Sequence, residues 1–241
     1  MKSSFALFLA IGVASLARVA SAGDITGTVT LGGTPPPEKE ITLLEDDPIC
    51  GKMHSDKVFT AFYKVGPNHE LADVIVMLKG VPAKAADAGK PPVLLDQKGG
   101  LYIPQILAIQ TGQTLLVRNS DSTVHNVAMD PKASANVEAY ALNSNQTQMA
   151  GGADLTYTFT APENFMKYHC DVHPWMFAWV TVVDHPYFAV TGPDGKFTIK
   201  DVPPGKYTIS ALHYKLARAG VDKQVDVKDG GAAVDFTIEA K

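Results

Sequence analysis

Long hydrophobic runs are scarce in this chain of 241 residues. The one exception lies at the start, where residues 5–16 are apolar, Lys2 precedes them and the small residues Ala20-Ser21-Ala22 follow. This is the pattern of a secretory signal peptide cleaved before Gly23. The apolar stretch is short for a membrane span, which needs about 20 residues, although a retained N-terminal anchor is the alternative. We therefore expect residues 1–22 to be a signal peptide and the protein to be periplasmic or otherwise exported, with no transmembrane segment after cleavage.

Basic residues are too few to outnumber the acidic ones. The chain has 21 Lys and Arg against 25 Asp and Glu, a formal net charge of −4. Removal of residues 1–22 takes away Lys2 and Arg18 but no acid, which leaves a charge of −6. Nucleic-acid binding depends on basic patches, so the balance argues against a nucleic-acid partner.

Cysteine is also rare, with only Cys50 and Cys170 in the sequence. A chain of this length buries a sizeable core without disulfides. Two cysteines in an exported protein would ordinarily form one disulfide, and this alternative would leave no thiolate for a metal. The residues around Cys170 favour the other interpretation, in which the thiol is a metal ligand.

Apolar repeats at helical period are missing, and short alternating runs take their place. Such runs, separated by glycine and proline turns, predict an all-β protein made of β-sandwiches. Residues 82–92 are rich in Ala, Gly, Lys and Pro and predict a loop or linker, whereas residues 132–153 fit either a loop or a short helix. The runs that predict strands are 25–30, 74–78, 114–118, 124–129, 156–160, 179–183, 207–211 and 233–238.

One turn signal is especially strong. Asp194-Gly195 lies between the alternating runs 188–191 and 196–199. An Asp-Gly pair between two such runs predicts a β-hairpin, in which the two strands pair with each other.

The segment Tyr168-His169-Cys170-Asp171-Val172-His173-Pro174-Trp175-Met176 carries the clearest chemistry. Cys170, His173 and Met176 stand at positions i, i+3 and i+6, and His125 lies 45 residues before Cys170. Two imidazoles, one thiolate and one weak thioether are the ligand set of a blue-copper electron-transfer site. Thiolate and thioether favour Cu(I) and imidazole serves both oxidation states, so the set suits one-electron exchange.

Neighbouring residues fit supporting roles. Pro174 fixes its own φ and stiffens the loop, and Asn126 is expected to bind across to the segment of Cys170 and hold the two ligand segments in register. His169 precedes Cys170 on a strand and should point to the opposite face, so we expect it to be structural. Trp175 lies between two ligands and is either a core residue or part of an apolar docking patch beside His173.

A second group of soft ligands stands near the start of the chain. Cys50, Met53 and His54 lie within five residues and could form a second soft-metal site. The favoured alternative is a buried free cysteine beside two surface residues, because no fourth ligand is evident nearby.

The motifs Cys170-x-x-His173-x-x-Met176 and His125-Asn126 resemble those of the cupredoxins, and the short ligand loop is most similar to that of amicyanin. The resemblance covers a domain expected at residues 91–185, and it implies a Greek-key β-sandwich. It also implies one type 1 copper held by His125, Cys170, His173 and Met176.

Another resemblance concerns the ends of the chain. The motifs in residues 191–197 and 202–207, with the run 25–29, resemble carboxypeptidase-regulatory-like (transthyretin-like) β-sandwich modules. Residues 23–90 and 186–241 would then be two parts of one split module, with three consecutive blocks as the simpler alternative. The whole resembles exported bacterial methylamine-utilisation-type cupredoxins.

The sequence thus predicts an electron carrier rather than an enzyme. Expected partners are redox proteins such as a c-type cytochrome or a periplasmic dehydrogenase. The sequence has no Ser-His-Asp order, phosphate loop or zinc signature, and no second copper site of three histidines. Copper sequestration or delivery is one alternative function, and a structural or binding β-sandwich with a vestigial copper motif is another.

Overall fold

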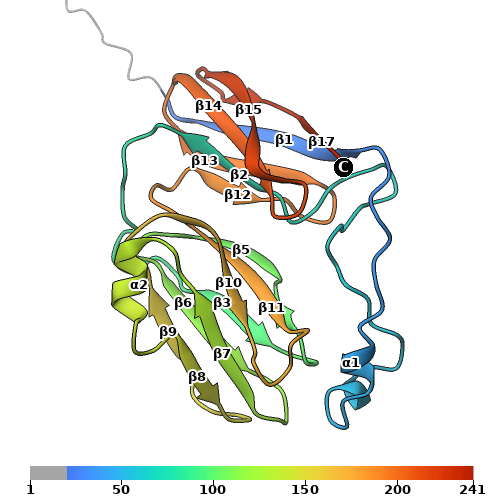
Figure 1. Ribbon diagram of the computed structural model, residues 1–241. Coiled ribbons are helices and arrows are strands. Elements are labelled where there is room, and N and C mark those ends of the chain that lie inside the picture. The colour runs from blue at the N-terminus through green and yellow to red at the C-terminus, as the bar shows by residue number, and fades with distance from the viewer. Residues whose placement is uncertain (1–20, 241) are drawn as a thin grey trace, which may run out of the picture.

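The computed structural model describes residues 21–240, and these form two β-sandwiches stacked one above the other (Figure 1). The prediction of an all-β fold is confirmed, because strands make up almost all of the regular structure. The expected signal peptide falls almost entirely outside the described residues. Between residues 21 and 240 there is no helix with the length and apolar character needed to cross a membrane.

The central sandwich comprises β3 to β11 in two sheets. One sheet has the order β5-β11-β10-β7-β8, and the other has the order β4-β3-β6-β9. Its strands are β3 (Val93–Gln97), β4 (Tyr102–Ile103), β5 (Ile106–Gln110), β6 (Thr114–Asn119), β7 (His125–Asp130), β8 (Asn145–Gln148), β9 (Leu155–Thr158), β10 (Glu163–His169) and β11 (Phe177–Val183).

The core of the central sandwich follows from alternation along its strands. In β6, Leu115, Val117 and Asn119 are buried while the residues between them are more exposed, as the two faces of a strand require. Fully buried aromatic rings from β9 and β10, such as Tyr157 and Tyr168, fill the space between the sheets. The core reaches Cys170 and Met176 at one end of the sandwich.

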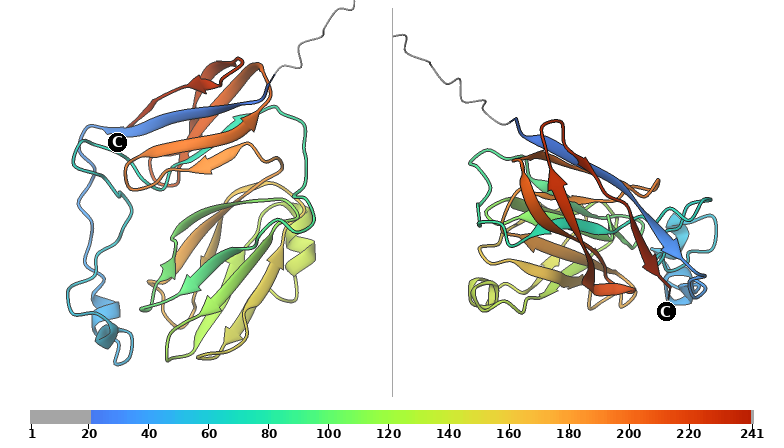
Figure 2. Two further views of the ribbon diagram at one scale, coloured as in Figure 1. Left: turned by 180° about the vertical axis from the view of Figure 1, so that it is seen from behind. Right: turned by 90° about the horizontal axis from the view of Figure 1, so that it is seen from above.

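The flanking sandwich comprises β1, β2 and β12 to β17. One sheet has the order β13-β1-β16 with β17 also paired to β1, and the other has the order β12-β2-β14-β15. Figure 2 shows β17 running alongside β1, so strands from the two ends of the chain share one sheet. Its strands are β1 (Gly23–Gly32), β2 (Ile75–Lys79), β12 (Phe188–Val190), β13 (Lys196–Val202), β14 (Gly205–His213), β15 (Ala217–Val227), β16 (Ala232–Ala233) and β17 (Phe236–Glu239).

The hairpin prediction at Asp194-Gly195 is wrong in its pairing. The chain does turn there, with Gly195 at φ +66° and its N–H donating to the carbonyl of Gly192. However, β12 pairs with β2 and β13 pairs with β1, so the two strands enter different sheets. The turn is a local property, whereas the choice of partner depends on the long-range packing of the sandwich.

The undecided segment 132–153 contains both helix and strand. The helix α2 (Ser134–Tyr140) covers one edge of the central sandwich, and β8 follows it and pairs with β7. Asn136 within α2 is fully buried, and its side chain bonds Ala161 and Glu163. These contacts attach the helix to the loop before β10 and to the start of β10.

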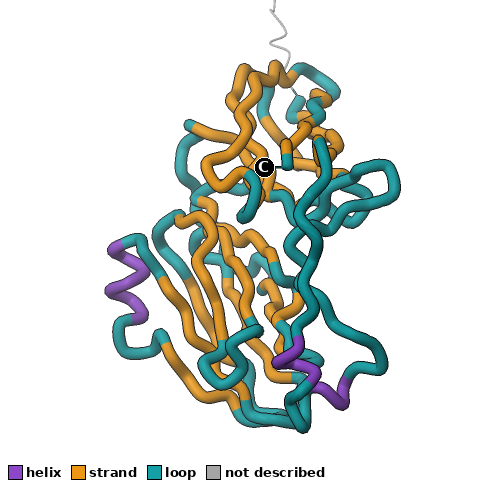
Figure 3. The backbone as a smooth tube through the Cα atoms, turned by 45° about the vertical axis from the view of Figure 1, so that its right-hand side comes forward, coloured by secondary structure: helices purple, strands orange, loops and turns teal. Residues whose placement is uncertain are grey.

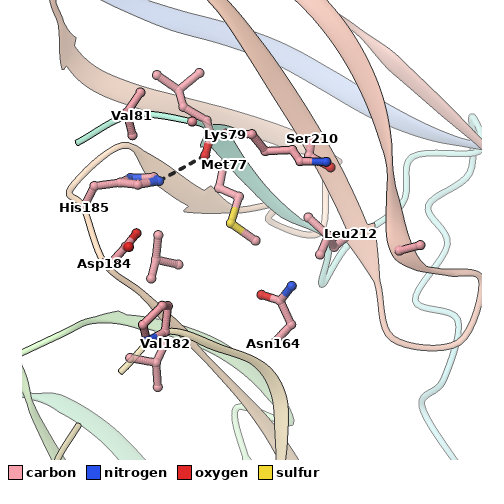
Figure 4. Close-up of a pocket in the computed structure, with 14 residues that line it drawn as sticks. Met77, Lys79, Val81, Asn164, Val182, Asp184, His185, Ser210 and Leu212 are labelled. Carbon is pink, nitrogen blue, oxygen red and sulfur yellow. Dashed lines mark hydrogen bonds between the residues drawn. The ribbon is translucent and has the colours of Figure 1, made fainter. Parts of the chain in front are cut away.

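The two sandwiches meet through a separate small cluster that includes Ile75, Ile106, Phe165 and Leu212. A cavity of about 420 Å³ lies beside this contact, between β2, β14 and the end of β11. Figure 4 shows the ring of His185 at its edge, bonded through Nε2 to the carbonyl oxygen of Leu78 at 3.0 Å. Nε2 of this ring is therefore not available to bind a ligand. The described residues that line the cavity include no cluster of metal-binding side chains.

A long connection, residues 33–74, leaves the flanking sandwich after β1 and returns to it at β2. We call it the arm. It extends along the central sandwich to the opposite end, where it carries α1 (Thr42–Glu45) and the short 3-10 helix η1 (Gly51–Met53) (Figures 1 and 3). Its outgoing and returning halves are joined by backbone bonds, including that from Ile41 N–H to the carbonyl of Val58 at 2.8 Å.

Candidate metal centre

Three of the expected ligands are carried by neighbouring segments of one sheet. His125 opens β7, Cys170 directly follows β10, and His173 lies on the loop that leads to β11. β7 and β10 pair antiparallel, with His169 opposite Ala128. Residues 45 positions apart therefore meet at the same end of the sandwich.

The side chains converge closely. Nδ1 of His125 lies 3.0 Å from Nδ1 of His173, and Sγ of Cys170 lies 3.6 Å from the same His173 atom. All three residues are buried. Two nitrogen donors and one sulfur donor thus face a common point that is shielded from solvent.

Met176 ends the ligand loop and is fully buried. Its N–H donates to the carbonyl of His173 at 2.9 Å, and its own carbonyl accepts from the N–H of Cys170 at 3.2 Å. These two bonds close the loop tightly, which keeps Cys170, His173 and Met176 together. The thioether remains our expectation for a weak axial ligand.

Asn126 joins the two ligand segments. Its backbone N–H donates to Sγ of Cys170 at 3.3 Å, and its side-chain Oδ1 accepts from the N–H of Asp171 at 2.5 Å. The contact across the strands is the one expected from the sequence. A hydrogen bond to the sulfur also stabilises a thiolate.

Asp121 was not anticipated from the sequence. Its Oδ2 lies 2.9 Å from Nε2 of His125, and the carboxylate also accepts from the N–H groups of Gly99 and Gly100. This contact occupies Nε2. The nitrogen of the His125 ring that remains available to bind a metal is therefore Nδ1, which faces the centre. The only sequence signal was the turn-prone run 119–122 just before β7.

The buried charges of the centre depend on one another. Burial alone would lower the pKa of His125, but its bonds to Asp121 and Cys170 outweigh burial and raise the pKa to about 9. Burial alone would raise the pKa of Cys170, but bonds from His125 and from the N–H of Asn126 lower it. Burial and the neighbouring His125 together lower the pKa of His173. The centre therefore favours a thiolate beside positive charge.

Two neighbours of the ligands are only partly buried. The ring of Trp175 lies 5.1 Å from that of His173, and its Nε1–H donates to the carbonyl of Gly100 at 3.0 Å. His169 lies on β10 with its ring directed to Asp171, 3.2 Å away, and to Asp130. The expected structural role of His169 agrees with these contacts.

The tip of the arm brings Cys50 to the same place. Ligand atoms of Cys50, His125 and His173 all lie within 4.8 Å of one another, and Cys50 is fully buried. Cys50 and Cys170 are both free, so the alternative of a disulfide between them is not what the structure shows. Burial and the charge of Asp47 raise the pKa of the Cys50 thiol to about 12.

Asp47 fixes the turn that presents Cys50. Its Oδ1 accepts from the N–H groups of Ile49 and Cys50, at 3.0 and 2.7 Å. Its Oδ2 lies 3.7 Å from Nε2 of His173. The outer nitrogen of each site histidine thus faces a carboxylate, Asp121 for one and Asp47 for the other.

Two members of the second group expected from the sequence, Cys50 and His54, have contacts with distant segments of the chain. Nε2 of His54 lies 2.6 Å from the carbonyl oxygen of Gly99, which docks the arm onto the central sandwich. The thiol of Cys50 instead joins His125 and His173. The favoured expectation was a buried free cysteine, and Cys50 is buried and free, with His125 and His173 as neighbours that are distant in the chain.

The donor set fits a soft or borderline metal ion. His125 and His173 present their Nδ1 atoms to each other at 3.0 Å, and this contact requires a proton or a cation between the two lone pairs. A thiolate, two imidazoles and a buried thioether match copper in both oxidation states. His125, Cys170, His173 and Met176 are the residues that would hold it.

Comparison with protein families agrees with this chemistry. Residues 95–183 match the family described as copper binding proteins, plastocyanin/azurin family. This part of the chain is therefore a cupredoxin domain, and the family match together with the donor set identifies copper as the metal of the centre. A comparison with curated proteins gives no match.

Solved structures with a similar part include a Cu-containing nitrite reductase (NirK) from Thermus scotoductus SA-01, at 22% identity and a TM-score of 0.32, covering 45% of this chain and 25% of that one. A Cu(I) structure of a single-site amicyanin mutant has 20% identity and a TM-score of 0.31, covering 45% of this chain and 98% of amicyanin. A purple cupredoxin from Nitrosopumilus maritimus has 24% identity and a TM-score of 0.31, covering 39% of this chain and all of that one. The match thus spans only a quarter of the nitrite reductase.

Proposed function

We propose that this protein is an exported type 1 (blue) copper protein that carries single electrons between redox partners. The observation that carries the proposal is the convergence of His125, Cys170 and His173, with Nδ1 to Nδ1 at 3.0 Å and Sγ to Nδ1 at 3.6 Å. Copper bound to such a set would supply a one-electron couple between Cu(I) and Cu(II).

The surroundings of the donors keep them in place. Asp121 orients His125, Asn126 bridges to the segment of Cys170, and the backbone bonds of Met176 close the loop. Outer hydrogen bonds of this kind fix ligand orientation and tautomer. These bonds limit the movement of His125, Cys170, His173 and Met176 between the two oxidation states, and this favours electron transfer.

The ligand loop is our candidate for the partner-docking face. Trp175 is half-buried beside His173, and Val172 on the same loop is 57% exposed. An apolar patch next to a ligand would exclude water and bring a partner close to the metal. The expected partners are a c-type cytochrome or a periplasmic dehydrogenase.

The test is spectroscopic. Mature protein loaded with Cu(II) should show an intense visible band from thiolate-to-copper charge transfer, and ascorbate should bleach it reversibly. Cys170→Ser should abolish the band, whereas Met77→Leu, which removes a sulfur from β2 in the flanking sandwich, should leave it unchanged. A band that survives Cys170→Ser would refute Cys170 as the ligand.

Copper storage or delivery is the second candidate, and one observation favours it. His173 is only 6% exposed, because the arm and Trp175 cover the centre. A covered site holds a metal well but limits contact with an electron-transfer partner. Rapid electron exchange with a c-type cytochrome would support the shuttle, and ready surrender of Cu(I) to a partner or chelator without such exchange would support delivery. Apo protein that binds no metal would instead support a vestigial motif.

We also propose a domain organisation in which a cupredoxin domain, residues 91–185, is inserted into a carboxypeptidase-regulatory-like module made of residues 23–90 and 186–241. The pairing of β1 with β13 and of β2 with β14 supports this division. Replacing residues 91–185 by a short Gly-Ser linker should leave a folded flanking sandwich with dispersed amide resonances. An unfolded product would contradict an independent flanking module.

A further inference from the structure

The arm is anchored at the metal centre rather than only passing by it. Residues 42–54 form its tip, and two of its polar side chains anchor it on the central sandwich: His54 bonds the carbonyl of Gly99, and Asp47 lies beside His173. The tip is therefore built against the same loops that carry the ligands. Its position determines which side chain is placed over the two histidines.

That side chain is the thiol of Cys50. It is fully buried, it forms no disulfide, and it lies within 4.8 Å of ligand nitrogens of both His125 and His173. A buried cysteine that serves only packing is expected to lie among apolar side chains. Cys50 belongs to none of the three hydrophobic clusters of the described chain, whereas Cys170 belongs to the central one.

The opposing surface leaves room for this thiol. Gly100 has a φ of +66°, and a Cβ at this position would lie 2.8 Å from Cβ and 3.0 Å from Sγ of Cys50. The carbonyl of Gly100 accepts from Trp175, and its N–H is held by Asp121, so the backbone cannot easily move away. Glycine at position 100 therefore permits Cys50 to lie over the centre.

We propose that Cys50 is a second thiolate ligand of the copper centre in its Cu(I) state, supplied by the arm and joining His125, His173 and Cys170. Its thiol would release a proton to solvent as it binds the metal. The inference rests on the proposed copper site and adds one donor to it. Two thiolates and two imidazoles form a soft set that suits Cu(I). Because Cys50 comes from the arm, copper binding also attaches the arm, and through it the flanking sandwich, to the central sandwich.

The direct test counts sulfur ligands. X-ray absorption of full-length protein loaded with Cu(I) should give two short thiolate bonds per copper in the wild type and one in Cys50→Ser. Met53→Leu is the matched control, since it removes another sulfur from the same tip, and it should keep two. Competition with a Cu(I) chelator should show that Cys50→Ser lowers the affinity at least about tenfold.

Amide hydrogen exchange gives a second measurement. Addition of Cu(I) should slow exchange in residues 42–54 of the wild type and of Met53→Leu, but not in Cys50→Ser. A side chain that only packs against the centre would give the same response to Cu(I) in all three proteins.

The outcomes separate this inference from the proposed function. One thiolate per copper in the wild type, with the visible band of the Cu(II) protein intact, would overturn the role of Cys50 and leave the electron carrier in place. Failure of the wild type to bind copper would overturn both. The number of thiolate bonds per copper in the wild type decides whether Cys50 is a ligand, even if Cys50→Ser does not fold.

Discussion

The two sandwiches both bury histidines, but they use them in opposite ways. In the flanking sandwich, burial alone lowers the pKa of His213 to about 4, and its Nδ1 accepts from the N–H groups of Lys215 and Leu216. In the central sandwich, His125 is equally buried, yet Asp121 and Cys170 overcome burial and raise its pKa to about 9. The ring of His213 stays neutral and bonds the backbone, whereas the ring of His125 lies among charged groups.

The difference shows that burial of a histidine does not by itself indicate a site. His185 bonds the backbone of β2, and His213 bonds the backbone of the turn that directly follows it. Nδ1 of His125 faces another imidazole and a thiol instead. Convergence of donors on one point distinguishes a metal centre from a structural histidine.

The largest expected effect concerns stability in the flanking sandwich alone. Phe236 is 1% exposed in the flanking core, so Phe236→Ala should lower the free energy of unfolding by about 3–5 kcal/mol. Urea unfolding followed by far-ultraviolet circular dichroism measures the change. The visible spectrum of the copper-loaded folded protein should stay the same. A shifted spectrum would show that packing in the flanking sandwich affects the metal centre of the central sandwich.

The pH dependence of stability should reveal the neutral His213. Its pKa is about 4 in the folded protein against about 6.5 when unfolded, so only the unfolded chain gains this proton between these values. The free energy of unfolding should therefore decrease as pH falls from about 6.5 to about 4, by about 3 kcal/mol from this residue. His213→Asn keeps an acceptor near Nδ1 but cannot titrate, so the apo variant should lack this part of the decrease. Equal pH profiles for the two apo proteins would contradict the assignment.

A matched pair of substitutions tests the two kinds of histidine against each other. His125→Gln keeps a donor for Asp121 but removes the Nδ1 ligand, and it should lower copper affinity by at least about 100-fold. His213→Asn should leave the affinity unchanged. Competition with a Cu(I) chelator measures both. Similar losses in the two variants would mean that the flanking sandwich contributes to the centre in a way its contacts do not indicate.

The smallest expected effect concerns the carboxylate behind His125. Asp121→Asn removes the charge that orients the ring, and copper affinity should fall about tenfold. Asp154→Asn is the control, because its ion pair with Arg118 lies at the surface of the same sandwich. An unchanged affinity in Asp121→Asn would show that the backbone alone orients His125.

Much of the central sandwich could be predicted from local patterns. The run 114–118 alternates because β6 has one face in the core, and Cys170, His173 and Met176 stand close in sequence because one loop carries them. The prediction of a hairpin at Asp194-Gly195 was wrong because turn chemistry does not fix strand pairing. Asp121 was missed because an acidic residue in a polar turn has no distinguishing pattern.

The sequence by itself determined the all-β fold and the kinds of donor atoms, because strand alternation and ligand chemistry are properties of neighbouring residues. Only the tertiary structure decided which distant residues meet. It placed β1 beside β17, extended the arm along the central sandwich, and brought Cys50 to His125 and His173. The physical reason is that strand pairing and arm docking depend on contacts between residues far apart in the chain, and no local spacing encodes those contacts.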